Sequence, residues 1–216
     1  MIDSLIGQLS DQGISVCWYE HISQRNTRLK EAAYLTICDA WLHQMVLKHP
    51  TVGPWVRRAV QLGLSLKYPV SAEANKDAPV VLQKAAHALH EFICKHGLSQ
   101  VFLVAHSAGA ITASMLASMP KTPHAHAIQK VVCFGYPFKF PDRDEEPYRT
   151  AHLAHVATPF LIVQGDEDRY GSAEAAHRYT LASSIQVVSV QSGHDYDYAC
   201  KQTLDQIRTF LDLPAR

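Results

Sequence analysis

An unbroken apolar run that ends in a group of very small residues constrains the fold more than any other part of this sequence. The run is VFLVAHSAGA, from Val101 to Ala110. Apolar segments of this kind, with no alternation of polar residues, are typical of strands that are buried on both faces of a parallel sheet. A helical pattern follows at once and ends before Pro120. The sequence therefore predicts a tight strand-to-helix turn centred on Ser107.

The same alternation of strand and helix continues through the second half of the chain. Apolar runs predict strands at 130–136, 158–165 and 185–193, and helical spacing predicts helices at 78–96, 108–119, 173–182 and 198–213. Strands that alternate with helices imply a three-layer α/β domain with a mostly parallel sheet. The length of 216 residues fits one such domain, residues 1–216.

Composition excludes several classes of partner. Lys+Arg and Asp+Glu both number 20, so the formal net charge of +0 predicts no nucleic-acid partner and no anionic membrane surface. The first residues, MIDSLIGQLSDQG, lack the basic start and apolar core of a secretory signal, and no segment is apolar over the ~18 residues that a membrane span needs. The five cysteines show no CxxC pairing. We expect them to be free and buried in a cytoplasmic protein.

The turn itself carries a possible nucleophile. The segment AHSAG, residues 105–109, matches the small-x-Ser-x-Gly pattern with alanine in the first position. Such a turn lifts the hydroxyl of Ser107 above the sheet, and the backbone N–H of Ala108, at a helix N-terminus, points to where an oxyanion forms. The alternative is a serine that only caps an ordinary helix. The motif alone leaves both interpretations open.

Two later segments supply the partners that a serine nucleophile needs. TPFLIVQGDEDRYG places Asp166 and Asp168 after one predicted strand, and VVSVQSGHDYDY places His194 after the next. Parallel sheets carry their sites at the carboxyl ends of the strands, so these side chains are expected to meet Ser107. Serine, acid and histidine in this order favour a nucleophile with His194 as its base.

The segment from Gln100 to Asp212 resembles the α/β-hydrolase fold, most closely its small dienelactone-hydrolase-like members. The resemblance rests on AHSAG, on FGYPFKFPDRDEEPYRTAHL and on TPFLIVQGDEDRYG. It implies that Ser107 is the nucleophile, His194 the base and Asp168 the orienting acid. Asp166 is then expected to cap its turn. The implied activity is hydrolysis of a small carboxylic ester or thioester through an acyl-enzyme, with a small acyl compound as substrate and no cofactor.

The other histidines do not suggest a metal site. Six of them form pairs at helical or alternating spacing: His87 with His90, His124 with His126, and His152 with His155. No third ligand at a recognisable spacing accompanies any pair, so no metal is expected. His106 is expected to pack under the turn and to point away from Ser107.

The front of the chain departs from the family pattern, because no glycine-rich oxyanion loop precedes Ser107. In one interpretation, the helix that ends at Gly13 and a strand at 14–20 are the elements that follow the oxyanion loop in the family. The strand that bears this loop is then absent. The strand at 14–20 then pairs directly with the one that contains Phe102. In the other, 14–20 is the oxyanion strand and Tyr19–Gln24 replaces the loop. We favour the first, in which Ala108 N–H is the one donor that can be named.

Residues 21–77 are predicted to form a helical insertion under the first interpretation. Their apolar side chains either fill the core or line an acyl pocket as a cap. Loss of an oxyanion donor costs about 2.7–4 kcal/mol of transition-state stabilisation. A second class of function therefore stays open, namely a non-catalytic or weakly active interaction protein with the same fold.

Overall fold

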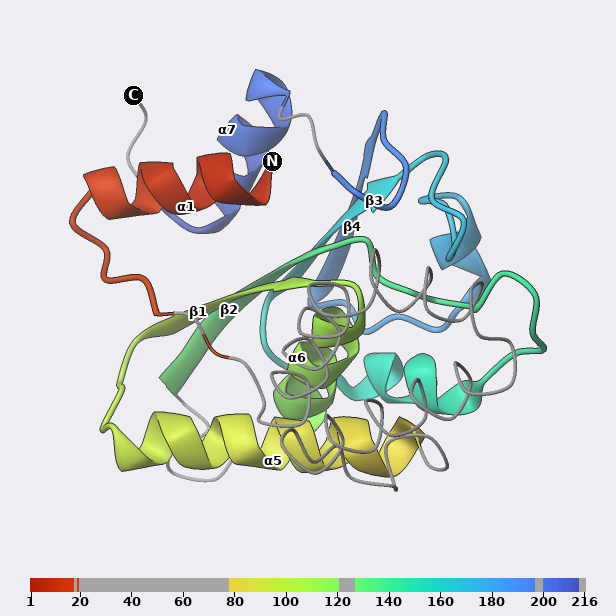
Figure 1. Ribbon diagram of the computed structural model, residues 1–216, viewed down its shortest axis with the longest axis horizontal. Helices are drawn as coiled ribbons and strands as arrows, with labels where there is room; N and C mark the ends of the chain where they lie inside the picture. Colours follow the sequence, from red (N-terminus) through yellow and green to blue (C-terminus); the bar gives the residue numbers. More distant parts are fainter. Residues whose placement is uncertain (18, 20–77, 121–126, 197–199, 214–216) are drawn as a thin grey trace, which may run out of the picture. The chain divides into compact units, whose positions relative to one another are not determined.

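The computed structural model describes residues 1–17, 19, 78–120, 127–196 and 200–213 (Figure 1). Two compact units divide the chain: Met1–Cys17 with Leu82–Arg216, and Trp18–Val81. The expected insertion at 21–77 lies outside the described residues, as do His124 and His126. The assignment of residues 1–216 to one domain stays a prediction.

Four parallel strands form the sheet of the first unit. They are β1 (Val101–His106), β2 (Ile128–Phe134), β3 (Phe160–Gly165) and β4 (Ile185–Val190), and they lie in the order β1-β2-β3-β4. One row of the register runs from Leu103 through Val131 and Phe160 to Ile185. Because every pair is parallel, all four carboxyl ends meet at one edge of the sheet. The four strands predicted in the second half of the chain are thus confirmed to within a few residues.

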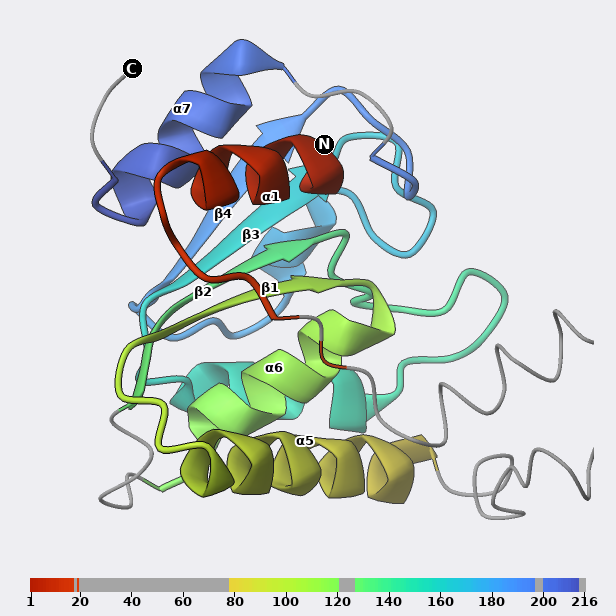
Figure 2. The same cartoon turned by 60° about the vertical axis from the view of Figure 1, so that its left-hand side comes forward.

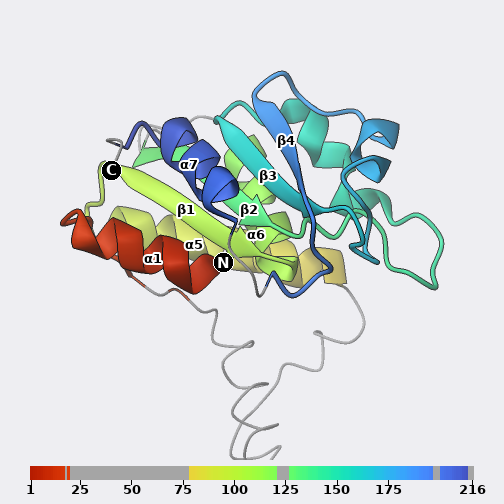
Figure 3. The same ribbon diagram turned by 90° about the horizontal axis from the view of Figure 1, so that it is seen from above.

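Helices cover both faces of this sheet (Figures 2 and 3). The helices α1 (Ile2–Asp11) and α7 (Lys201–Phe210) lie on one face, and α5 (Ala78–Lys95) and α6 (Ala108–Ser118) lie on the other. Alternate residues of β2 serve the two layers, since Val132 and Phe134 pack with α1 and α7, whereas Val131 and Cys133 pack with α6. This is the predicted three-layer α/β arrangement.

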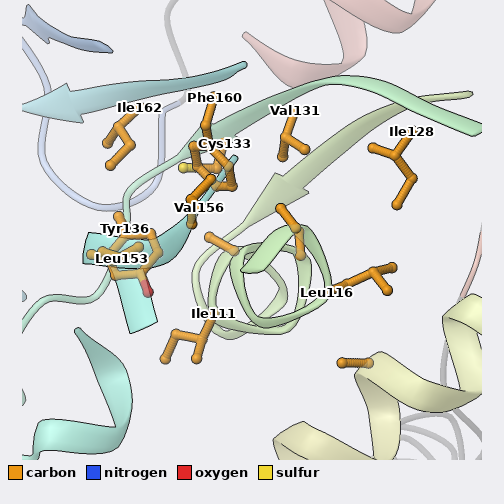
Figure 4. Close-up of a cluster of buried hydrophobic side chains, with 14 of the residues drawn as sticks. Ile111, Leu116, Ile128, Val131, Cys133, Tyr136, Leu153, Val156, Phe160 and Ile162 are labelled. Atoms are coloured by element: carbon orange, nitrogen blue, oxygen red, sulfur yellow. The ribbon is translucent and has the colours of Figure 1, made fainter. Parts of the chain in front are cut away.

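The layer beneath α6 contains the larger core cluster. This cluster includes Ile111 and Leu116 of α6 together with Val131, Cys133 and other strand residues (Figure 4). Three short 3-10 helices border this layer: η3 (Pro147–Arg149), η4 (Ala151–His155) and η5 (Ala175–Arg178). Complete burial raises the pKa of the Cys133 thiol, so this cysteine stays protonated and is an apolar part of the core.

The predicted strand at 14–20 is wrong over the residues that the structure describes. Ile14–Cys17 has no strand conformation, and the Val16 side chain is 46% exposed. β-Branched residues favour strands only where a neighbouring strand pairs with them. Within the described chain β1 pairs only with β2. Over residues 14–17 and 19, which the structure describes, the expected pairing with the strand of Phe102 is therefore also wrong.

Three further expectations need correction. The β1 residues are each only partly buried, because β1 is an edge strand of the described sheet rather than a central one. The helix expected at 173–182 is reduced to η5, which includes no more than four residues. Among the four described cysteines, Cys17 and Cys200 are exposed and Cys94 is half-buried, so the expected burial holds only for Cys133. None of the described helices is long and apolar enough to span a membrane.

Candidate active site

The turn after β1 places Ser107 in a strained backbone conformation. Its φ is 52° and its ψ is −124°, a positive φ that side-chain-bearing residues seldom adopt. Two backbone hydrogen bonds fix the turn: Ser107 N–H donates to Phe134 O at 3.1 Å, and Ala110 N–H donates to Ser107 O at 2.8 Å. Helix α6 begins at the next residue, Ala108, which is exposed. Its N–H belongs to the first turn, where such groups lack partners within the helix.

The structure brings Ser107, His194 and Asp168 together in one chain of hydrogen bonds. The Oγ of Ser107 lies 2.8 Å from His194 Nε2. The other ring nitrogen, Nδ1, lies 3.0 and 2.9 Å from the two carboxylate oxygens of Asp168. A carboxylate only accepts, so Nδ1 carries a proton and, in the neutral ring, Nε2 is free to accept the proton of Ser107. The Asp168 side chain is fully buried, and that of His194 is 14% exposed.

Three more donors hold the Asp168 carboxylate. Tyr170 N–H donates to Oδ1 at 2.9 Å, Gln164 Nε2 donates to Oδ2 at 3.2 Å, and the Tyr196 hydroxyl lies 3.4 Å from Oδ2. The Tyr196 hydroxyl also accepts the N–H of Gly165 at 2.6 Å. Burial raises the pKa of Tyr196 far above its ordinary value, so the hydroxyl keeps the proton that it donates.

Close packing at the end of β2 makes room for these side chains. Gly135 has a φ of +59°, and a Cβ there would lie 2.7 Å from Tyr196 Cε2 and 3.2 Å from both Asp168 Oδ2 and His194 Cε1. Only glycine avoids both the strain and the collision. By contrast, a Cβ at Gly109 would contact Ala105 Cβ at 3.9 Å, an ordinary distance. Position 109 therefore has room for a methyl group, and space alone does not require glycine there.

The neighbouring acids are separate from this chain of hydrogen bonds. The Oδ1 of Asp166 accepts the backbone N–H of Ser192 at 3.1 Å and so caps the loop after β4. Asp195 is exposed. Of these three acids, Asp168 is the one that hydrogen-bonds the His194 ring.

A second serine–histidine contact lies in the core. The Oγ of Ser114 lies 2.7 Å from His152 Nε2 and 3.1 Å from the Tyr136 hydroxyl. Ser114 is completely buried, whereas Ser107 is partly exposed. Burial lowers the pKa of His152 from 6.5 to about 4. His87 and His90 make local contacts within α5, and no group of three or more metal-ligating side chains occurs among the described residues.

The model of a family described as an alpha/beta hydrolase domain matches residues 68–210, about two thirds of the chain. The chain belongs to the alpha/beta hydrolase family.

Solved structures of low identity resemble this alpha/beta hydrolase in part. A Listeria innocua gene product is 16% identical with a TM-score of 0.45, covering 64% of this chain and 68% of its own. MGS-MChE2, an alpha/beta hydrolase enzyme from the metagenome of lagoon sediments at Mar Chica, Morocco, is 19% identical with a TM-score of 0.44, covering 61% and 68%. No curated protein matches the chain significantly.

Several contacts of the candidate site were not predicted from the sequence. Gln164, Tyr170 and Tyr196 bind the Asp168 carboxylate, and His106 contacts the backbone of His194. A signal for Gln164 was present, because a polar residue that ends an otherwise apolar strand needs buried partners. No comparable signal marks Tyr196, since a tyrosine two residues after a histidine has no fixed geometry in a loop.

Proposed function

We propose that this alpha/beta hydrolase is a serine hydrolase that cleaves a small carboxylic ester or thioester through an acyl-enzyme. One observation carries the proposal: the partly exposed Ser107 Oγ lies 2.8 Å from His194 Nε2, while Asp168 binds the opposite ring nitrogen. Family membership supports hydrolysis in general. The resemblance of the motifs to small dienelactone-hydrolase-like proteins supports a small acyl substrate, and the cytoplasmic location stays a prediction.

The proposed chemistry assigns one role to each group. His194 Nε2 takes the proton of Ser107 as Oγ attacks the carbonyl carbon, and Ala108 N–H donates to the oxyanion that forms. Asp168 keeps Nδ1 protonated and stabilises the imidazolium. His194 then gives its proton to the leaving alcohol or thiol, and the acyl group stays on Ser107. A water molecule, deprotonated by His194, releases the carboxylic acid and restores Ser107.

Ser114 also contacts a histidine, but it is not expected to act as the nucleophile in this scheme. Its hydroxyl is completely buried and also donates to Ile111 O at 2.9 Å. A carbonyl substrate has no route to such an atom without unfolding the core. The pair of serines therefore supplies both a test and its matched control.

The test is covalent labelling with a fluorophosphonate probe. Wild type and Ser114→Ala are expected to label on one serine, and Ser107→Ala is expected not to label while it keeps its thermal stability. A folded wild type that resists the probe and hydrolyses no p-nitrophenyl or thioester substrate would support the alternative, an interaction protein with the same fold.

A further inference from the structure

The histidine that precedes Ser107 makes a specific contact with the segment that carries His194. The Nε2 of His106 lies 2.9 Å from the backbone oxygen of His194. The ring centroids of His106 and His194 are 5.1 Å apart. The Tyr196 ring packs edge-on against the His106 ring, with 5.9 Å between their centroids. Because a carbonyl only accepts, His106 carries a proton on Nε2 and donates it. The contact is therefore more than the packing under the turn that the sequence suggested.

This hydrogen bond connects both partners of the Ser107–His194 contact to one strand. β1 ends at His106, so the backbone of β1 sets the position of Ser107 directly. The side chain of His106 reaches across to the loop after β4 and holds the carbonyl of His194. A shift of the β4 loop would otherwise move Nε2 of His194 away from Ser107 Oγ without moving the serine.

Other contacts hold the same loop on either side of His194. Ser192 N–H donates to Asp166 Oδ1 before it, and the Tyr196 hydroxyl accepts from Gly165 N–H after it. Both of these connect the loop to the end of β3. His106 supplies the connection to β1, the strand that leads into the nucleophile. Because β1 leads into Ser107, the contact with β1 constrains the distance between Ser107 and His194. The two contacts with β3 do not constrain this distance.

We propose that His106 is a positioning residue, which donates from Nε2 to the His194 carbonyl and thereby holds the His194 ring in reach of Ser107. The inference rests on the proposed function, because it assigns His106 a role in the same reaction. Small displacements of reacting groups cost large factors in rate, whereas substrate binding depends on other surfaces. Loss of the donor is therefore expected to lower kcat and leave KM nearly unchanged.

The test compares three replacements of His106 with one matched control. Phenylalanine keeps a ring but removes the donor. Glutamine places an N–H at about the reach of Nε2, and asparagine is too short to do so. His177 is exposed on η5 and serves as the control, as His177→Phe. Each protein is assayed for p-nitrophenyl acetate hydrolysis, for its rate of fluorophosphonate labelling, and for amide hydrogen exchange in residues 191–196.

We expect His106→Phe to lower kcat and the labelling rate about tenfold, with KM changed less than about twofold. His106→Gln should recover most of this loss, and His177→Phe should equal wild type. Exchange at 191–196 should accelerate in the phenylalanine variant and not in the glutamine variant. If the phenylalanine variant does not fold, the glutamine and asparagine variants give the same comparison.

Three outcomes overturn the inference, and they separate it from the proposed function. Equal kcat in wild type and the phenylalanine variant shows that the donor is dispensable. Equal losses in the glutamine and phenylalanine variants show that ring shape, not the hydrogen bond, is what matters. A wild-type protein that neither hydrolyses the ester nor reacts with the probe overturns the proposed function and the role of His106 in the reaction. In that case, hydrogen exchange still shows whether His106 holds the loop at 191–196.

Discussion

The side-chain amide of Gln164 lies 3.2 Å from the Asp168 carboxylate, and neither residue is more than 4% exposed. The same amide accepts Tyr136 N–H at 2.8 Å and donates to Gly171 O at 2.5 Å. Gln164 therefore connects the ends of β2 and β3 with the loop that follows Asp168. This single buried amide satisfies backbone groups that would otherwise be unpaired in the core.

Replacing Gln164 by methionine, which has a similar volume, is expected to lower the free energy of unfolding by about 2–4 kcal/mol, because it leaves several buried polar groups without partners. Urea denaturation measures the loss. Gln186→Met is the matched control, since Gln186 lies exposed on the adjacent strand β4. Similar stabilities for the two variants would contradict the role that we assign to Gln164.

The two acids after β3 should differ sharply in their effect on reactivity. Asp168→Asn keeps the size of the side chain but removes the charge and allows the wrong tautomer of His194, so we expect fluorophosphonate labelling to slow by about 10³–10⁴-fold. Asp166→Asn keeps the oxygen that accepts Ser192 N–H, so its labelling rate should stay within a few fold of wild type. Equal losses in both variants would refute the assignment of Asp168.

The sequence predicted the strands and the turn because their signals are local. An apolar run such as Phe160–Gly165 and a small-residue turn at Ser107 each specify their own conformation, and the parallel order brings the carboxyl ends together. The failure at Ile14–Cys17 has the opposite cause. Its β-branched residues favour a strand, but strand formation depends on a partner that no local pattern identifies.

The parts of the site that the sequence did not predict depend on contacts distant in the chain. His106 contacts His194 across 88 residues, and Gln164 contacts the backbone of Tyr136 across 28. Because the serine, the acid and the histidine each follow a predicted parallel strand, the sequence predicted that these segments lie at one edge of the sheet. It did not specify which neighbouring polar atoms would meet there, because that depends on loop conformation.

Two glycines near the site should respond differently to alanine. Gly135→Ala combines a positive φ with a Cβ that would lie 2.7 Å from the buried Tyr196 ring, so we expect it to cost about 2–4 kcal/mol of stability. Gly109→Ala lies in the first turn of α6 with room for a methyl group and should leave stability unchanged or raise it by up to about 1 kcal/mol. Thermal denaturation of both variants checks the contrast, and equal melting temperatures would contradict it.

The partial burial of His152 predicts a loss of stability in acid. Burial lowers the pKa of His152 to about 4 in the folded chain, against 6.5 for the exposed side chain. The unfolded chain therefore binds the proton more readily between these values. Stability from this group is complete above pH 6.5 and falls as the pH drops towards 4, by about 1–2 kcal/mol after allowance for the partial exposure of the ring.

A variant that cannot titrate isolates this effect from the other acid-sensitive groups. We expect wild type to lose about 1–2 kcal/mol more than His152→Gln when urea denaturation is repeated at pH 7 and pH 4.5. His155→Gln is the control, because His155 is exposed in the same short helix η4 and should leave the wild-type dependence intact. Parallel pH dependences for wild type and His152→Gln would mean that His152 keeps an ordinary pKa in the fold.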